Sequence, residues 1–491
     1  MKPAEDRGEN VGLMEPMLIG EGSHHRGVLT DLAVELAQKS AGFRRSLPPG
    51  LLASLADLVR SMNCYYSNLI EGHDTHPVDI ERALKDDYSK DPRKRDLQLE
   101  AKAHIAVQKW IDSGGLNGHA ATSDSIREVH RRFCERLPDD LLWVEDPATK
   151  ERVRVVPGEL RERDVRVGDH IAVSPGAVSR FLMRFEEVYN RLSKTDSILG
   201  TAAAHHRLVW IHPFVDGNGR VARLMSHAML LESLDTGAVW SVARGLARNV
   251  DRYKAHLAAC DRTRRNDLDG RGNLSEEALA SFTEFFLRTC IDQVEFMESL
   301  MQPDRLRARI LLWAEEEIRI DALPPKSTSI LEAVLYRGEL PRADAAGVVG
   351  AGERHARRIV AALVERGVLV SDSPRGPLRL AFPAALASRW MPGLFPEKVN
   401  APEQHDLKFP APDERYIFDR GVVVFEGQDG EKRVRCEISR EALDDHFHGD
   451  NSDKLEVFRA NGPIIERAAR AKYLAGRTEP DGSVLIRTLD L

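Results

Sequence analysis

The residue types best suited to chemistry lie in one run, His212-Pro213-Phe214-Val215-Asp216-Gly217-Asn218-Gly219-Arg220. Backbone N–H groups at the first turn of a helix bind phosphates, and Gly217 and Gly219 let the backbone approach them closely. Arg220 and Arg223 lie three residues apart, a spacing that places both on one helix face and suits a grip on adjacent phosphates. The run therefore predicts a phosphate-binding site.

Two other residues of this run have chemistry that suits a bound phosphate chain. Asp216 is a ligand type for Mg²⁺, which prefers one or two carboxylates together with phosphate oxygens and water. His212 is the group in the run that can accept a proton at neutral pH. A histidine before proline is by itself more often a cap or a buried hydrogen-bonding residue, so the interpretation depends on the whole run. Together the residues predict phosphoryl or nucleotidyl transfer.

The elements that must position this run are predicted to be helices. Apolar periodicity indicates helices over 177–191 and 197–211, and a third begins just after Gly219 and extends to about Leu234. The glycine run therefore joins two helices. Further helices are expected over 51–72, 251–260 and 275–301. The fold class is expected to be mainly α.

The rest of the chain is predicted to form separate modules. Residues 1–28 form a polar leader without clear periodicity, expected to be loose or to lie as an arm on the surface. Residues 303–397 have the order helix, short helix, helix and two strands, which resembles a winged helix-turn-helix. The proline-rich segment 398–412 is predicted to be a linker, and 413–491 a small α+β domain.

The composition limits the class of protein and its compartment. A chain of 491 residues is expected to hold about two to four domains. The 42% apolar and 30% charged residues are those of a globular protein, and the net charge of -7 gives no overall attraction to nucleic acid or an anionic membrane. Five scattered cysteines favour a reducing compartment. We expect a cytoplasmic protein without a membrane partner, since no apolar stretch approaches about 20 residues.

The run of glycines and arginines resembles the signature of the Fic family, His-x-Phe-x-Asp/Glu-Gly-Asn-Gly-Arg-x-x-Arg, at every fixed position through Arg223. Other segments that look like members of this family are 157–161, 165–170 and 269–275. The resemblance covers about residues 30–390. It implies a Fic core over 29–302 that folds as a helical bundle.

The resemblance also implies an activity, protein adenylyltransfer, in which AMP passes from ATP to a Ser, Thr or Tyr hydroxyl of a target protein or of the chain itself. His212 would be the base and Asp216 the Mg²⁺ ligand, while Asn218 would hold the α-phosphate. ATP and its phosphates are expected to be bound by Gly217, Asn218, Gly219, Arg220, Arg223 and Tyr253. For Tyr253 a place in the core is an equal alternative. The presence of both glycines favours AMP transfer over the phosphate transfer of the Doc branch.

The Val- and Arg-rich segment 153–168, around Pro157-Gly158, predicts a β-hairpin among the helices. In Fic proteins a flap pairs edge-on with a segment of the target protein, as in strand addition generally. The resemblance therefore implies a target-docking flap over 161–168, and a plain structural hairpin is the alternative. The flap residues singled out are Arg161, Val165, Val167 and Gly168.

A second short pattern, Ser67-x-x-x-Glu71-Gly72, resembles the inhibitory helix of this family. By itself a Ser and a Glu four apart on a helix usually face solvent. The resemblance implies that Glu71 pairs with Arg223, which then cannot hold the γ-phosphate. An enzyme restrained within its own chain is the expectation, although His73 stands where many relatives have Asn.

Several alternatives remain open at this stage. Glu71 could position water to remove AMP from a modified target, so a deAMPylase is the runner-up activity. The helix over 353–366 carries Arg354, Arg357 and Arg358, which leaves a DNA-binding regulator as a hypothesis of another class. A homodimer is also possible. Residues from 413 resemble a small bacterial domain of unknown function and suggest no chemistry.

Overall fold

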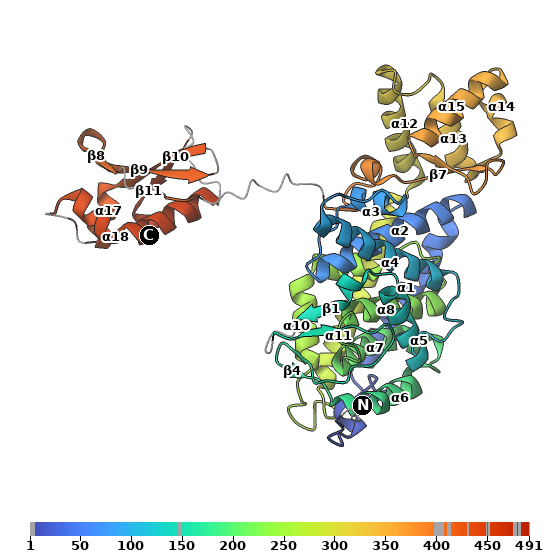
Figure 1. Ribbon diagram of the computed structural model, residues 1–491, viewed down its shortest axis with the longest axis horizontal. Coiled ribbons are helices and arrows are strands. Elements are labelled where there is room, and N and C mark those ends of the chain that lie inside the picture. The colour runs from blue at the N-terminus through green and yellow to red at the C-terminus, as the bar shows by residue number, and fades with distance from the viewer. Residues whose placement is uncertain are drawn as a thin grey trace. The chain divides into compact units, whose positions relative to one another are not determined.

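The computed structural model describes residues 5–145, 150–396, 407–409, 414–429, 432–447, 449, 452–474, 479 and 483–490. The fold is mainly α with small sheets, as predicted (Figure 1). The chain divides into two compact units, Met1–Phe395 and Pro396–Leu491. Most of the predicted linker, 398–412, lies outside the described residues.

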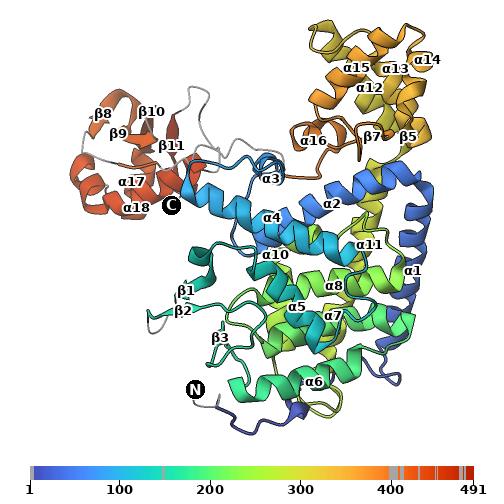
Figure 2. The ribbon, with the colours of Figure 1, turned by 45° about the vertical axis from the view of Figure 1, so that its right-hand side comes forward.

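The centre of the first unit is a pair of helices, α7 (Lys194–Ile211) and α8 (Asn218–Leu234), joined by the loop 212–217. Both are buried on nearly all sides, as is typical of helices inside a core. In Figure 2 they lie between a layer with α2 and α4 and a layer with α6. The surrounding helices are α1 (Arg26–Ser46), α2 (Pro49–Ile70), α3 (Pro77–Leu84), α4 (Pro92–Asp112), α5 (Ser123–Cys134), α6 (Val178–Tyr189), α9 (Val242–Arg248), α10 (Val250–Cys260) and α11 (Glu276–Leu300).

The four strands that precede α6 form two separate ribbons, which differ from the predicted hairpin over 153–168. Strand β1 (Trp143–Glu145) pairs with β2 (Arg152–Arg154), and β3 (Arg166–Val167) pairs with β4 (His170–Ile171). The turn at Pro157-Gly158 is present, but the strand before it, β2, pairs with the earlier strand β1 and not with a strand after the turn. The prediction of a hairpin over 153–168 was therefore wrong about which strands pair, because local turn residues do not determine which distant strand a segment meets.

The N-terminal segment is an arm that is anchored in the bundle. Met14 and Met17 have exposed fractions of 0% and 2%, and they belong to the main apolar core. The backbone carbonyl of Glu15 accepts a hydrogen bond from the N–H of Leu274 at 2.8 Å. Of the two alternatives for residues 1–28, the described part of this segment follows the arm rather than the loose leader.

Residues 303–395 extend the same apolar core. Their elements are α12 (Pro303–Arg319), α13 (Ser327–Arg337), β5 (Glu339–Leu340), α14 (Ala345–Val349), α15 (Glu353–Glu365), β6 (Leu369–Val370), β7 (Leu378–Leu380) and α16 (Ala387–Trp390). The strands form an antiparallel sheet in the order β5-β7-β6. This part contacts α2, since the Tyr66 hydroxyl donates to the carbonyl of Leu394 at 2.9 Å.

The second unit has its own apolar core. Its elements are β8 (Arg415–Ile417), β9 (Val422–Asp429), β10 (Lys432–Ser439), α17 (Arg440–Phe447), α18 (Lys454–Leu474) and β11 (Val484–Ile486). The sheet order is β11-β10-β9-β8, with β10 and β11 parallel and the other pairs antiparallel. Short 3₁₀ helices of both units lie at Val11–Met14, Asp139–Leu142, Pro175–Ala177, Arg342–Asp344, Ala384–Leu386, Phe418–Arg420 and Thr488–Asp490.

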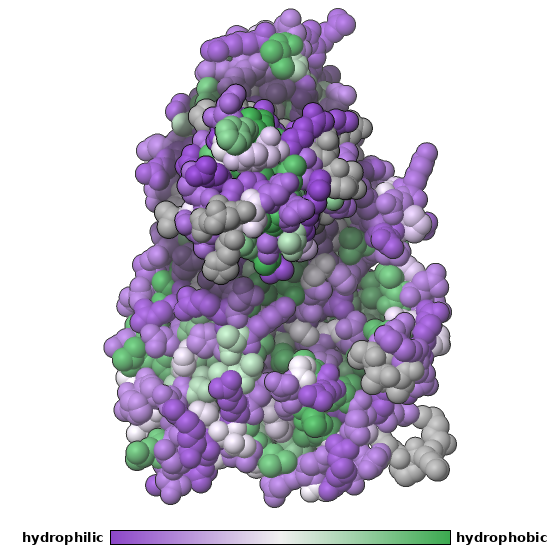
Figure 3. All heavy atoms as spheres, turned by 90° about the vertical axis from the view of Figure 1, so that its left-hand side faces the viewer, coloured by the Kyte–Doolittle hydropathy of each residue, from purple (hydrophilic) through white to green (hydrophobic). Residues whose placement is uncertain are grey.

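The surface is mostly hydrophilic on the face in Figure 3, with small groups of apolar residues between the polar ones. Within the described residues, every helix is too short or too polar to span a bilayer.

Candidate active site

His212 lies where α7 ends and the loop to α8 begins. Its backbone is in the left-handed region, with φ of 51° and ψ of 63°, a conformation that concentrates at functional sites when a non-glycine residue adopts it. Burial, followed by the positive charge of Arg161, lowers the pKa of His212 from 6.5 to about 4. Its Nδ1 is buried without a hydrogen-bond partner among the described residues. The ring is therefore neutral at pH 7.

The loop after His212 is held in shape by side chains on both sides. The Asn218 amide accepts a hydrogen bond from the N–H of Phe214 and donates one to its carbonyl, both at 2.9 Å. The Phe214 ring stacks on His130 with centroids 3.8 Å apart. His130 Nδ1 in turn accepts from the N–H of Gly158 at 2.9 Å. Asn218, predicted to hold the α-phosphate, here hydrogen-bonds to the backbone of the loop.

The two motif glycines are required by the structure for different reasons. Gly217 has φ of 83°, the left-handed conformation that favours glycine, and starts α8. A Cβ on Gly219 would lie 2.6 Å from Glu71 Oε1 and 3.1 Å from Arg223 NH1. The carboxylate of Glu71 therefore lies directly over the first turn of α8, where the backbone of Gly219 leaves room for it.

Arg223 is fixed by the end of α2. Its side chain is 2% exposed and contacts Glu71 Oε1 at 2.5 Å. Its Nε donates to Ser67 Oγ at 2.8 Å, and an NH2 group donates to the Ser67 carbonyl at 3.1 Å. Burial opposes ionisation of Glu71, but the charge and hydrogen bond of Arg223 outweigh it and lower the pKa of Glu71. Gly72 has φ of 85° and follows the helix end.

Arg220 has a second carboxylate partner that the sequence reasoning missed. Its guanidinium pairs with Glu100 of α4 and, at 2.9 Å, with Asp216. Glu100 also contacts His73 Nδ1 at 2.9 Å. Glu100 stands with Ala103, His104 and Val107 on the buried face of α4, and a charged residue at such spacing in an apolar stripe is the signal that could have found it.

Tyr253 lies in the core rather than on an open pocket wall. Its side chain is 3% exposed, and its hydroxyl contacts His205 Nε2 at 2.6 Å. Burial raises the pKa of Tyr253 to about 12. Of the two sequence alternatives, this placement favours the core tyrosine.

The predicted flap residues separate into a buried clamp and an exposed hairpin. Arg161 is 2% exposed, and its Nε donates to the His212 carbonyl at 2.7 Å. Its buried guanidinium therefore holds the hairpin root to the loop 212–217 and is not exposed for docking. The hairpin follows, and at its base the Val165 carbonyl accepts a hydrogen bond from the N–H of Ala172. The Val167 side chain is 43% exposed, and Gly168 lies at the turn with φ of 60°.

The comparisons with known proteins agree with the Fic signature. Residues 120–230 match the family described as Fic/DOC family. Residues 120–230 are a Fic domain. The chain is 31% identical over 171 residues to the "Protein adenylyltransferase Fic" of Drosophila melanogaster, and 30% identical over 171 residues to that of Drosophila erecta. Each match covers 34% of this chain and 32% of the relative, so the similarity spans about a third of these relatives' length.

Solved structures and a second family match complete the comparisons. A Fic family protein from Desulfovibrio desulfuricans G20 aligns with 74% of this chain and 98% of its own, at 17% identity and a TM-score of 0.43. Fic-1 from C. elegans aligns with 56% of this chain and 75% of its own, at 19% identity and a TM-score of 0.42. Residues 407–486 match the family described as "Protein of unknown function (DUF1488)".

Proposed function

We propose that the chain is a protein adenylyltransferase that uses ATP to attach AMP to a Ser, Thr or Tyr hydroxyl of a protein, and that it is restrained by Glu71. The observation that carries the proposal is the placement of a neutral His212 at the start of the loop that leads into the first turn of α8. The relatives named above, about a third of whose length matches this chain, are called protein adenylyltransferases.

The chemistry begins with the acceptor hydroxyl beside His212. His212 takes the hydroxyl proton, the oxygen forms a bond to the α-phosphorus of ATP, and the bond to the bridging oxygen breaks so that pyrophosphate leaves. The N–H groups at the start of α8 stabilise the negative charge on the α-phosphate oxygens. A well-placed donor of this kind contributes about 3 kcal/mol to the transition state.

Asp216 is the residue that would hold Mg²⁺. Its side chain is 49% exposed, so the carboxylate is accessible from the site. Among the described residues no group of three or more His, Cys, Asp or Glu could hold a metal, which suits an ion that depends on one carboxylate plus phosphate oxygens. When bound, Mg²⁺ would supply charge neutralisation on the phosphates.

The restraint follows from the position of Glu71. Its carboxylate lies over the α8 N-terminus and pairs with Arg223, the arginine proposed to hold the γ-phosphate. A triphosphate that needs Arg223 must displace this contact, so ATP would bind with its α-phosphate misaligned. The hairpin β3–β4 would then dock the target by its exposed edge, with Val167 and Ile171 43% and 66% exposed.

The test is the position of the label that is transferred. Purified Glu71→Gly protein and wild type are incubated with ATP labelled on either the α- or the γ-phosphate, and protein-bound label is measured. The proposal predicts incorporation of the α-label only, mainly in Glu71→Gly, with pyrophosphate released. Incorporation of the γ-label would mean kinase chemistry and would overturn the proposal. Competition by unlabelled GTP and CTP tests the base that is recognised.

A further inference from the structure

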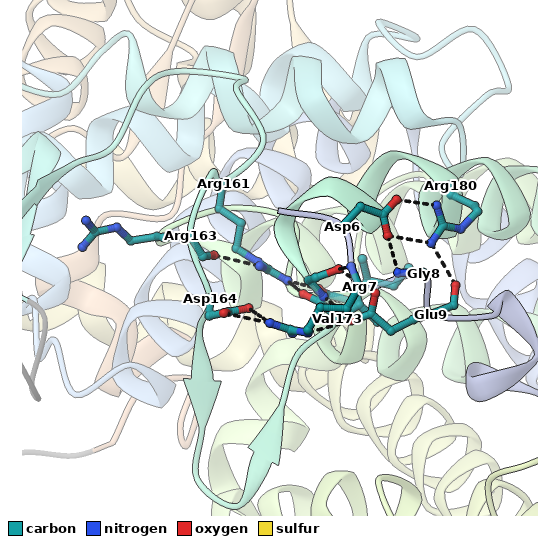
Figure 4. A network of polar contacts seen from close by, with 11 residues as sticks. Asp6, Arg7, Gly8, Glu9, Arg161, Arg163, Asp164, Val173 and Arg180 are labelled. Carbon is teal, nitrogen blue, oxygen red and sulfur yellow. Dashed lines mark hydrogen bonds and ion pairs between the residues drawn. The ribbon is translucent and has the colours of Figure 1, made fainter. Parts of the chain in front are cut away.

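Residues 5–9 of the N-terminal arm run across both roots of the β3–β4 hairpin (Figure 4). At the root before β3, Arg7 NH1 donates to both carboxylate oxygens of Asp164, at 2.9 and 3.0 Å. At the root after β4, the N–H of Arg7 donates to Ser174 Oγ at 3.1 Å. One arginine of the arm therefore connects the two chain segments from which the hairpin projects.

Glu9 adds a second contact on the same side. Its Oε1 accepts a hydrogen bond from the N–H of Ser174 at 2.8 Å, and its Oε2 accepts from the Ser174 hydroxyl. Ser174 is fully buried, so this carboxylate meets a group that is closed to solvent. The arm itself is fixed to α6, because Arg180 pairs with Asp6 at 2.8 Å and donates to the Glu9 carbonyl at 2.9 Å.

Arg161 also holds both roots. Its guanidinium donates to the carbonyl of Arg163 at 2.8 Å and to that of Val173, one on each root. The same side chain donates to the carbonyl of His212. Both roots are thus held by a buried arginine, Arg161, which also contacts the loop 212–217, and by the N-terminal arm.

Beyond these contacts, the hairpin is held to α7 by His170, whose Nε2 donates to the carbonyl of Trp210 at 2.8 Å. Each strand has two residues, and Val167 and Ile171 are exposed. Such a ribbon is not stable alone in water. We propose that residues 5–9 are a strap that fixes the pose of the hairpin, and that Arg7 is a positioning residue for the acceptor protein. The proposal rests on the proposed adenylyltransferase function, because the hairpin positions the acceptor hydroxyl at His212.

The strap predicts a defect in acceptor use and no defect in ATP use. Arg7 contacts the hairpin roots and none of the residues proposed to bind phosphate. A displaced hairpin misplaces the acceptor hydroxyl, and a misplacement of about 1 Å can cost up to about 100-fold in rate. The first turn of α8 stays unchanged, so the KM for ATP is expected to remain within about twofold of the parent.

The experiment uses the full-length Glu71→Gly protein as enzyme and a size-tagged His212→Ala copy as the acceptor. Arg7→Glu is introduced into the enzyme, and initial rates of α-label transfer are measured against acceptor and against ATP. Arg184→Ala is the matched control, because Arg184 pairs with Glu15 of the same arm at 2.6 Å and is similarly exposed, but lies away from the hairpin roots. Rescue is tested with Arg7→Asp combined with Asp164→Arg.

We expect Arg7→Glu to lower kcat/KM for the acceptor by about tenfold, the charge swap to restore most of it, and Arg184→Ala to change it by less than about twofold. Amide hydrogen exchange over 165–172 is measured on the same proteins and is expected to be faster in Arg7→Glu alone. Unchanged acceptor kinetics and unchanged exchange in Arg7→Glu would overturn the strap. If the Glu71→Gly parent transfers no label, the proposed function fails, and the exchange measurement still decides whether the strap holds the hairpin.

Discussion

Two buried arginines three residues apart on α8 meet carboxylates in different ways. Arg223 pairs with Glu71, at the C-terminal end of α2, whose side chain is 34% exposed. Arg220 pairs with Glu100, inside α4, whose side chain is 7% exposed and also holds His73. A carboxylate at a helix end can move away without unpacking a helix, whereas one in a helix interior cannot. The difference favours Glu71 as a removable restraint and Glu100 as part of the scaffold.

The largest effect is expected from removing His212, the proposed base. His212→Ala in the Glu71→Gly background is expected to lower α-label incorporation by about 1000-fold, since a general base contributes about 10²- to 10⁴-fold. The measurement is the initial rate with α-labelled ATP, with circular dichroism as the control for folding. A rate within about threefold of the Glu71→Gly parent would show that His212 is not the base.

Removing Glu100 tests the scaffold side of the comparison. Glu100→Ala leaves the buried Arg220 without its carboxylate from α4, and breaking a buried ion pair costs about 3 kcal/mol. Glu71→Gly is expected to cost less, because the Glu71 side chain is 34% exposed against 7% for Glu100. Urea unfolding of the two proteins measures both values. Equal losses would remove the distinction between a restraint and a scaffold residue.

The pH dependence tests the environment of His212. Its pKa is lowered from 6.5 to about 4, so the ring stays neutral and able to accept a proton down to about pH 5. The labelling rate of Glu71→Gly is therefore expected to change little between pH 7.5 and 5.5. A histidine with a pKa of 6.5 would instead lose about tenfold over that interval. Initial rates in constant-ionic-strength buffers measure the profile, and an acid limb centred near 6.5 would contradict the lowered pKa.

The smallest expected effect concerns His73, the exposed partner of Glu100. The hydrogen bond to Glu100 raises the pKa of His73, although burial opposes the shift. A group with a raised pKa stabilises the fold below its ordinary pKa and loses that contribution as pH rises through the raised value. His73→Ala is expected to cost about 0.5 kcal/mol at pH 6 and less at pH 8. Urea unfolding at both pH values is the check, and a larger loss at pH 8 would contradict this coupling.

The sequence predicted the parts of the site that depend on short segments. His212 to Arg223 is one loop and one helix turn, and Ser67 to Gly72 is one helix end, so fixed spacing places their residues. Glu100 could not be placed in this way, because it lies 120 residues from Arg220 and only packing of α4 against α8 brings them together. The partner of Asn218 within the loop also escaped prediction, since it depends on the local fold around Phe214.

The hairpin and the arm show a second limit. The Pro157-Gly158 turn was predicted, but β2 pairs with β1, which lies before the predicted hairpin over 153–168. The sequence around Arg161 predicts an exposed side chain. Arg161 is buried because its guanidinium donates to backbone carbonyls that come together only in the folded chain. The arm is polar in composition, and two buried methionines anchor it in the core. Local patterns therefore predicted the elements and missed the contacts between distant ones.

The central claim is that Glu71, and not Glu100, restrains chemistry at His212. Its most direct test compares initial rates of α-label incorporation for wild type, Glu71→Gly and Glu100→Gln in one assay at equal protein and ATP concentrations. Coupling of a few kcal/mol corresponds to about 10- to 100-fold, so we expect that gain for Glu71→Gly and a rate at or below wild type for Glu100→Gln. An unchanged rate in Glu71→Gly, or an equal gain in Glu100→Gln, would contradict the account.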